Sequence, residues 1–309
     1  MSVVTIVMTT YNGEKYVGEQ IDSILSSTCK DFLLQIHDDG STDSTMDILK
    51  KYADRYPEII HIYRNKSNLG VTRNFLNAIC RTATDYVMLC DQDDVWMPNK
   101  ITDTLARMRN MEAQHGNEIP IAVFTDAVIS DGKMNVLQDS FFRSGKLDPS
   151  KTDLPHILME NKLIGCTVMI NSLLRRILQS HNLPGHARFH DWWIALIAAS
   201  FGRIGFIAEP TMYYRQHGKN IVGNQSFLSY FGNRIRTLKK QKKSLLALEK
   251  QADEFRILYR DILSVEKAEV INRFADLHNN NFFMKRYYIL RYGYKKTGFI
   301  RNTGVMFIV

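Results

Sequence analysis

The feature that most constrains the fold is a fourfold alternation of short apolar segments with segments of helical periodicity, near the start of the chain. The apolar segments are rich in β-favouring residues and indicate buried strands. The intervening segments repeat apolar residues every three or four positions, which is typical of amphipathic helices. The alternation predicts an α/β fold, a doubly wound and mostly parallel sheet flanked by helices. The predicted strands are residues 3–8, 32–37, 59–63 and 86–90, and the predicted helices are residues 16–25, 44–52 and 71–81.

Three carboxylates directly follow the fourth predicted strand, in the sequence Asp91-Gln92-Asp93-Asp94. In open α/β sheets, ligands bind outside the carboxyl ends of the strands. Clustered carboxylates repel one another unless a cation or a donor-rich partner relieves the repulsion, and their hard oxygens suit Mg or Mn. Two interpretations stay open on this stretch alone, a divalent-metal site for a phosphorylated substrate and a solvated acidic turn.

Two other strand exits carry residues that suit a nucleotide. Tyr11, within Thr9-Thr10-Tyr11-Asn12-Gly13, has a ring that could stack on a base. In Asp38-Asp39-Gly40-Ser41 the glycine lets the backbone approach a ligand, while a carboxylate accepts from a base or ribose hydroxyl. Taken singly, both motifs are equally compatible with ordinary turns and packing.

Together with Asn68-Leu69-Gly70 and Arg73-Asn74, these motifs resemble family 2 glycosyltransferases of the GT-A fold in order and spacing. The resemblance implies that the first two loops hold the nucleotide of a sugar-nucleotide donor. It also implies that Asp-Gln-Asp-Asp is a DXD motif, which binds the donor diphosphate through Mn or Mg. The resemblance assigns Tyr11 and Asp39 to the base, Asp91 to the nucleotide-sugar side and Asp93 to the metal. Thr9 and Gln92 are expected to bind the donor as well. Arg73 could approach the diphosphate or pair with a surface acid.

Residues 101–225 are expected to hold the acceptor. A predicted strand, residues 121–124, leads to Asp126, for which an acceptor contact and a structural cap are open alternatives. Farther on, His190-Asp191-Trp192-Trp193 heads an apolar helix. The helix macrodipole alone favours an acid such as Asp191 there, but it does not explain two adjacent tryptophans, whose indole faces suit the apolar side of a sugar. In the family resembled, an aspartate at this position is the catalytic base, so Asp191 is the expected base and Trp192 and Trp193 are expected acceptor contacts.

The segment Tyr214-Arg215-Gln216-His217-Gly218 resembles the part of the family that closes the site. The resemblance implies that His217 is a further metal ligand beside Asp93, which would give a mixed nitrogen and oxygen site compatible with Mn or Mg. Arg215 is expected to neutralise phosphate, and residues 218–223 are expected to form a mobile lid.

The expected reaction is a single in-line displacement with inversion at the anomeric carbon, since one carboxylate base and no covalent nucleophile are present. The sequence Asp91 to Trp96 is similar to that of bacterial rhamnosyltransferases, whose donor is dTDP-β-L-rhamnose and which act in polysaccharide assembly. A UDP-hexose donor fits the same motifs, and a non-catalytic sugar-nucleotide-binding protein is the alternative from another class. A nucleotidyltransferase would instead require a glycine-rich basic loop after the first strand.

The predicted domains are a catalytic domain, residues 1–225, with a nucleotide-sugar half at 1–100 and an acceptor half at 101–225, and a basic helical extension at 226–309. The net charge of +8 lies in this extension, and no acidic residue follows Asp276. Apolar residues spaced by three and four between positions 238 and 262 predict a helix that packs in cis or pairs two protomers in a homodimer.

Aromatic and cationic residues mix near the C-terminus, in Phe282-Phe283-Met284-Lys285-Arg286-Tyr287-Tyr288 and the positions after it. Such a segment suits an anionic membrane surface, which would fit a lipid-linked saccharide acceptor. No nucleic-acid partner is expected, because nothing else in the chain suits base readout. Four scattered cysteines and no recognisable signal peptide favour a cytoplasmic protein, peripheral at the inner face of the cell membrane.

Overall fold

The structure is a computed structural model that describes residues 3–116, 118–217 and 234–309. These residues form two compact units. Unit 1 comprises residues 1–141, 163–183 and 189–215, and unit 2 comprises residues 142–162, 184–188 and 216–309. Unit 2 thus includes two short segments that the sequence places within residues 101–225, in addition to the C-terminal helices.

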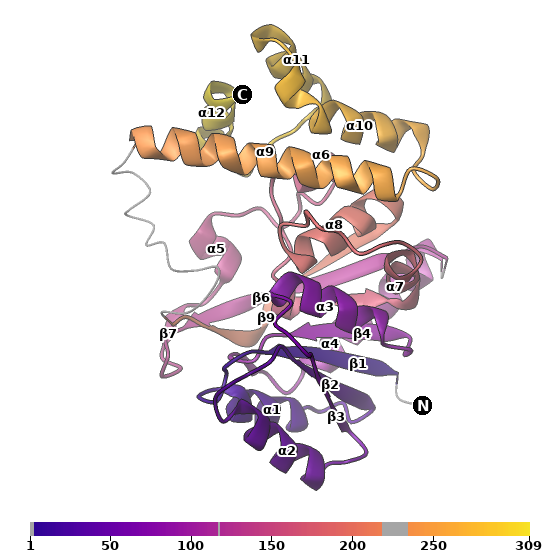
Figure 1. Cartoon of the computed structure of the whole chain (residues 1–309), viewed down its shortest axis with the longest axis vertical. Coiled ribbons are helices and arrows are strands. Elements are labelled where there is room, and N and C mark those ends of the chain that lie inside the picture. Colours follow the sequence, from indigo (N-terminus) through magenta and orange to yellow (C-terminus); the bar gives the residue numbers. More distant parts are fainter. Residues whose placement is uncertain (1–2, 117, 218–233) are drawn as a thin grey trace. The chain divides into compact units, whose positions relative to one another are not determined.

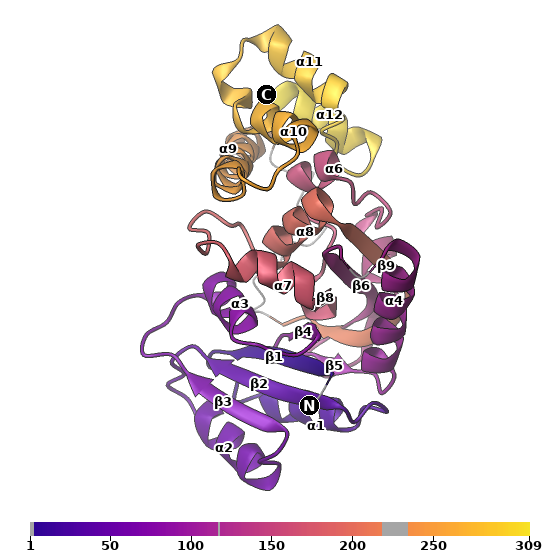
Figure 2. The same cartoon turned by 90° about the vertical axis from the view of Figure 1, so that its right-hand side faces the viewer.

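Unit 1 contains a mostly parallel sheet with helices on both faces, as the alternation predicts. Among the described residues the strand order is β3-β2-β1-β4-β8-β6-β9-β5, and β7 pairs with β6. Strands β1 (Val4–Thr10), β2 (Phe32–Asp38), β3 (Ile60–Arg64) and β4 (Tyr86–Cys90) are parallel neighbours. Helices α1 (Val17–Leu25) and α2 (Thr45–Arg55) lie on one face of these strands and α3 (Val71–Cys80) on the other (Figure 1, Figure 2).

The second half of the sheet is more irregular than the first. Strand β8 (Met169–Asn171) pairs antiparallel with both β4 and β6 (Ile121–Ser130). Strand β9 (Arg203–Arg215) runs parallel to β6, with register shifts near Asp126, and pairs antiparallel with β5 (Val95–Trp96). The remaining elements of this unit are β7 (Val136–Gln138), α4 (Lys100–His115), the 3-10 turn η1 (Gly165–Thr167), α7 (Ser172–Gln179) and α8 (His190–Phe201).

Burial explains why these segments form strands and helices. All seven residues of β1 are buried, because the strand lies inside the sheet and under helices on both faces. In α1, the buried side chains Val17, Ile21 and Ile24 recur at helical spacing. Residues 165–167 form a 3-10 turn directly before β8. Gly165 is needed there because the His190 ring approaches it closely: an added Cβ would lie 2.8 Å from His190 Nε2.

Unit 2 consists of helices, with α6 (Leu154–Met159), α9 (Arg234–Leu258), α10 (Val265–Ala275), α11 (Phe282–Tyr292) and α12 (Phe299–Ile308). The short helix α5 (Phe141–Gly145) and the 3-10 turn η2 (Leu277–Asn279) complete the described elements. None of the described helices is both long and apolar enough to cross a membrane.

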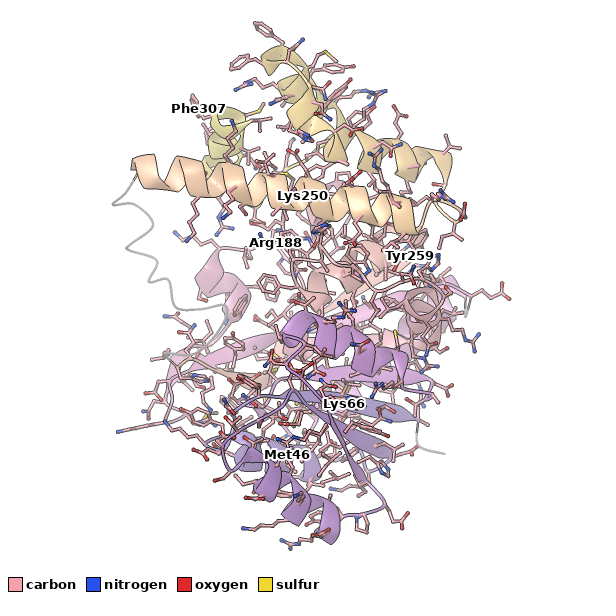
Figure 3. All side chains as sticks on the ribbon, in the orientation of Figure 1. Met46, Lys66, Arg188, Lys250, Tyr259 and Phe307 are labelled. Carbon is pink, nitrogen blue, oxygen red and sulfur yellow. The ribbon has the colours of Figure 1, made fainter. Side chains whose placement is uncertain are left out.

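Helix α9 packs against other helices of its own unit. Leu248, Ala252, Phe255 and Tyr259 of the predicted apolar seam are buried, and α9 contacts α6, α10 and α12 (Tyr259 is labelled in Figure 3). The described part of this seam therefore packs in cis, which is one of the two arrangements predicted from the sequence. The same side chains cannot also form the interface of a homodimer without unit 2 opening.

Polar contacts also join segments of unit 2 that are distant in sequence. The Glu160 carboxylate accepts from Arg301 Nη1 at 2.9 Å and from the Thr297 backbone N–H at 2.9 Å, and it pairs with buried Lys162. Glu254 accepts from the backbone N–H of Gly185 at 2.8 Å. The segments 142–162 and 184–188 are thereby held to the C-terminal helices.

Candidate active site

The parallel strands of unit 1 bring the predicted motifs to one edge of the sheet. The register pairs Thr10 with Asp38 and Asp38 with Arg64, and it pairs Met8 with Cys90. The loops that follow β1, β2, β3 and β4 therefore leave the sheet side by side. These loops carry Tyr11, Asp39, Asn65 and the acidic stretch 91–94.

Gln92 ties the first of these loops to the fourth. The Tyr11 backbone N–H donates to Gln92 Oε1 at 2.9 Å, and Gln92 Nε2 donates to the Tyr11 carbonyl at 3.1 Å. The Gln92 amide thus holds the Tyr11 backbone, while the Tyr11 ring is 48% exposed and its face is open to a ligand. Thr9 lies in β1 and is buried. The donor contacts expected of Thr9, Tyr11 and Gln92 stay predictions.

Asp38 and Asp39 are both buried and organise the neighbouring loops. Asp38 accepts from Thr10 Oγ1 at 3.0 Å and from the Ser41 backbone N–H at 2.9 Å. Asp39 accepts from the backbone N–H groups of Leu69 at 2.8 Å and Gly70 at 2.9 Å, and from the Asn65 side chain at 2.9 Å. Asp39 therefore orders the loop that leads into α3, and its contact with a base stays a prediction.

Arg73 follows that loop, in the first turn of α3. Its side chain is exposed and forms no hydrogen bond or ion pair with the residues that the structure describes. The alternative that Arg73 pairs with a surface acid is therefore not observed in this part of the chain. A guanidinium without a partner at this edge can receive an anionic ligand.

The acidic stretch combines burial with mutual repulsion. Burial and the charges of Asp93 and Asp191 raise the pKa of the Asp91 carboxyl to about 7. Burial and the charges of Asp93 and Asp91 raise the pKa of Asp94 well above its usual range. Asp94 Oδ2 is buried, and the side-chain hydrogen bond that the Asp94 carboxyl receives comes from the Cys166 thiol, a weak donor. Buried carboxylates that repel one another are costly, so the arrangement favours a cation as a further partner.

The donor set fits a hard divalent cation. Ligand atoms of Asp91, Asp94 and Cys166 lie within 4.8 Å of one another. Asp93 is not a member of this cluster, although its charge acts on both other acids. Burial and the nearby acids raise the pKa of the Cys166 thiol well above its usual range, so it stays protonated and the carboxylate oxygens are the ligands that suit Mn or Mg.

Arg215 holds this acidic stretch in place. Its backbone N–H donates to Asp94 Oδ1 at 3.0 Å, and its Nε donates to the Asp93 carbonyl at 2.7 Å. The guanidinium also donates to the Gly132 carbonyl at 3.1 Å, pairs with Glu19 and lies over the Tyr16 ring at 4.5 Å. Arg215 is only 2% exposed. The sequence expectation that Arg215 neutralises phosphate is corrected here, because its donors are directed at the protein.

Asp191 lies in the first turn of α8, with its neighbour His190 buried behind it. The Asp191 Oδ1 atom accepts from the Trp192 backbone N–H at 2.7 Å, and its charge reaches Asp91. The His190 ring stacks on Phe75 at 3.9 Å, and burial lowers the pKa of His190 to about 3. His190 is therefore a neutral buried imidazole and not a surface histidine, and Asp191 is the ionisable group that faces the acids.

Two of the expected acceptor contacts are changed by the structure. Trp193 is fully buried, so its indole has no open face and it is corrected to a core residue, whereas Trp192 is partly exposed. Asp126 is buried, accepts from the backbone N–H groups of Ala127 at 2.8 Å and Phe141 at 2.9 Å, and bonds the Ser140 hydroxyl. The structural cap is thus the observed role of Asp126.

The remaining sequence expectations lie beyond unit 1. His217 belongs to unit 2, and its coordination of a metal beside Asp93 stays a prediction. The expected lid, residues 218–223, falls outside the described residues. Cys166, Glu19 and Tyr16 also lie in this region of unit 1, and no sequence signal pointed to them. Asp94 was one of the three clustered carboxylates, but no individual role was predicted for it.

A mostly parallel α/β sheet flanked by helices, with clustered carboxylates at the edge where its strands end, is the architecture of the GT-A fold. The model of glycosyl transferase family 2 matches residues 5–119. The dTDP-rhamnosyl transferase RfbG of Shigella flexneri is 30% identical over 233 residues, which is 71% of this chain and 75% of that protein. The chain belongs to glycosyltransferase family 2.

Other relatives and solved structures agree with this fold. The putative glycosyltransferase EpsE of Bacillus subtilis is 24% identical over 75% of this chain and 79% of its own. S. aureus TarS 1-349 in complex with UDP-GlcNAc has a TM-score of 0.58 at 17% identity, over 88% of this chain and 70% of that one. The mannosyltransferase PcManGT from Pyrobaculum calidifontis, in complex with GDP-Man and Mn²⁺, has a TM-score of 0.56 at 14% identity, over 99% and 78%.

Proposed function

We propose that this family 2 glycosyltransferase transfers L-rhamnose from dTDP-β-L-rhamnose to a lipid-linked saccharide, in the synthesis of a bacterial cell-wall or surface polysaccharide. The observation that carries the choice of sugar is the relative 30% identical over 71% of the chain, whose name is dTDP-rhamnosyl transferase. A nucleotide-sugar donor is further supported by neighbours of the same fold that hold UDP-GlcNAc or GDP-Man.

In the proposed reaction, Asp191 accepts the proton of an acceptor hydroxyl as that oxygen attacks the anomeric carbon. The new carbon–oxygen bond forms as the bond to the diphosphate oxygen breaks, and dTDP leaves. A single displacement inverts the β-configuration and yields an α-rhamnoside. Tyr11 would stack on the base, Arg73 would approach the diphosphate, and Trp192 would contact the acceptor.

Mn or Mg, when bound, would neutralise the charge that develops on the leaving diphosphate. Asp91 and Asp93 would hold the ion, with His217 as a further ligand, and buried Asp94 could supply another oxygen. Arg215 would hold this stretch in place by donating hydrogen bonds to the Asp93 carbonyl and the Asp94 carboxylate. We place the protein at the inner face of the cell membrane, where a lipid-linked acceptor is found.

Release of nucleoside diphosphate from a panel of sugar nucleotides, with and without Mn or Mg, tests this proposal. We expect metal-dependent release from dTDP-rhamnose that is stimulated by a lipid-linked saccharide. Release from UDP-hexoses alone would support the glycosyltransferase activity and would show that the proposed donor, dTDP-rhamnose, is wrong. Tight donor binding without release, whatever acceptor is supplied, would favour a non-catalytic sugar-nucleotide-binding protein.

Arg215→Lys is expected to raise the metal concentration needed for half-maximal activity by about 10- to 100-fold, the usual effect of losing a residue that orients metal ligands. Lysine keeps the charge but cannot bridge three acceptors with a planar fork. Metal titration of diphosphate release measures the effect. Arg203→Lys, at the exposed start of the same strand, is the matched control. An unchanged metal requirement with a raised KM for the donor would instead assign Arg215 to phosphate.

A further inference from the structure

Helices α11 and α12 of unit 2 expose apolar side chains that a protein in water would be expected to bury. Phe283 is 79% exposed, Phe299 86% and Phe307 78% (Phe307 is labelled in Figure 3). Phe282, Tyr287, Leu290 and Ile300 are exposed as well. Clusters of exposed large apolar residues mark surfaces that contact another protein or a membrane.

These side chains form one line on each helix. At 100° per residue, Phe283, Tyr287 and Leu290 fall within about 60° of one another on α11, opposite the interior. Ile289, which points another way, is buried. On α12, Ile300 and Phe307 share the outer face, whereas Val305 is buried.

Arg286 joins the two helices at this surface. Its Nη2 donates to the carbonyl of Met306 at 2.6 Å, and its guanidinium lies over the Phe282 ring at 3.3 Å. Arg286 therefore links the N-terminal half of α11 to the last turn of α12. Together, the exposed side chains of α11 and α12 form what we call the aromatic face.

Cations flank this face and no acid lies near it in sequence. Arg286 and Arg291 fall on either side of the apolar line of α11, with Arg291 exposed, and Lys295 is exposed just after the helix. Six Lys and Arg residues and no Asp or Glu follow Asp276. Long cationic side chains beside an apolar stripe can extend to anionic headgroups while the stripe enters the bilayer boundary.

We infer that the aromatic face docks unit 2 on an anionic lipid bilayer, lying on the surface without crossing it. Each Lys or Arg near such a surface is attracted to it, and aromatic rings settle at the headgroup level. A second copy of this chain is the weaker candidate, because pairing two such faces would bring like charges together. The inference deepens the proposed function, since a lipid-linked acceptor would be met at that surface.

Co-sedimentation of the full-length protein with vesicles tests the inference without reference to catalysis. We expect binding to vesicles that contain phosphatidylglycerol and much weaker binding to phosphatidylcholine alone. The double variant Phe283→Ser and Phe307→Ser is expected to bind at least about tenfold more weakly, since two apolar anchors are lost. Val265→Ser removes an equally exposed apolar residue of α10 and is expected to bind like wild type.

Three outcomes would overturn the inference. The first is equal binding to both kinds of vesicle, and the second is unchanged binding by the double variant. The third is a concentration-dependent dimer in solution that the double variant abolishes. Diphosphate release from the donor, measured without vesicles, should be retained by the double variant, which would show that it is folded. Absence of release from wild type would count against the proposed function and would leave the vesicle result unaffected.

Discussion

Replacing Asp191 by asparagine is expected to lower nucleoside-diphosphate release about 10²- to 10⁴-fold, the usual contribution of a general base. Asparagine keeps the size of the side chain and the Oδ1 atom that accepts from the Trp192 N–H at 2.7 Å, so the start of α8 should be preserved. The lost function is proton acceptance. Because the loops that we expect to hold the nucleotide follow β1 and β2, we expect the donor KM to stay close to that of wild type.

Asp47→Asn provides the matched control for this prediction. Asp47 also lies in the first turn of a helix, α2, and is exposed. Both substitutions remove a favourable charge–dipole interaction, which is worth about 0.3–1 kcal/mol. Asp191→Asn also removes the repulsion between Asp191 and Asp91, so it should destabilise the fold by no more than Asp47→Asn does. Only Asp191→Asn should lower turnover strongly. Retention of more than a tenth of wild-type turnover by Asp191→Asn would place the base elsewhere.

The first half of the fold could be predicted from sequence because its signals are local. The predicted strand at 86–90 coincides with β4, and the other three predicted strands differ from the observed ones by one or two residues at their ends. Strands β1 and β4 are buried on both faces, so an apolar run is sufficient to identify each of them. The glycosyltransferase assignment depended on four motifs that occur in a fixed order.

The second half depends on contacts that no local pattern records. Only residues 204–207 resemble a strand in sequence, but strand β9 extends from Arg203 to Arg215. It continues past Glu209 and Pro210 because it pairs with β6 and, near its end, with β5. Residues 134–155 are polar, rich in turn-forming residues and without clear periodicity, yet they contain β7, α5 and the start of α6.

The roles of buried polar residues could not be predicted for the same reason. Arg215 was expected to contact a ligand, and for Asp126 a ligand contact was one of two open alternatives, because a charge after a strand is typical of a site. Their partners, Glu19 and Gly132 for Arg215 and Ser140 and Phe141 for Asp126, come from other parts of the chain. Full burial of Trp193 likewise depends on tertiary packing.

Asp91→Asn is expected to reduce turnover about 10²- to 10³-fold and, without metal, to raise the free energy of unfolding. Turnover falls because the acidic stretch loses an anionic ligand for the ion that stabilises the leaving diphosphate. Stability rises because burial and the charges of Asp93 and Asp191 disfavour the Asp91 carboxylate. A neutral amide of the same shape removes that cost. Diphosphate release and urea unfolding in the presence of a chelator measure the two effects.

Asp148→Asn should behave in the opposite way. Hydrogen bonds from Ser150 hold the pKa of Asp148 below its usual range, so its charged form is favoured by the fold and neutralising it should slightly lower stability while turnover is retained. Adding Mn should then stabilise wild type, since the ion binds the folded state alone, and should stabilise Asp91→Asn much less. If Asp91→Asn instead loses stability together with turnover, repulsion among the acids does not destabilise the folded protein. A cation at this edge of the sheet would then be supported only by the comparisons with known proteins.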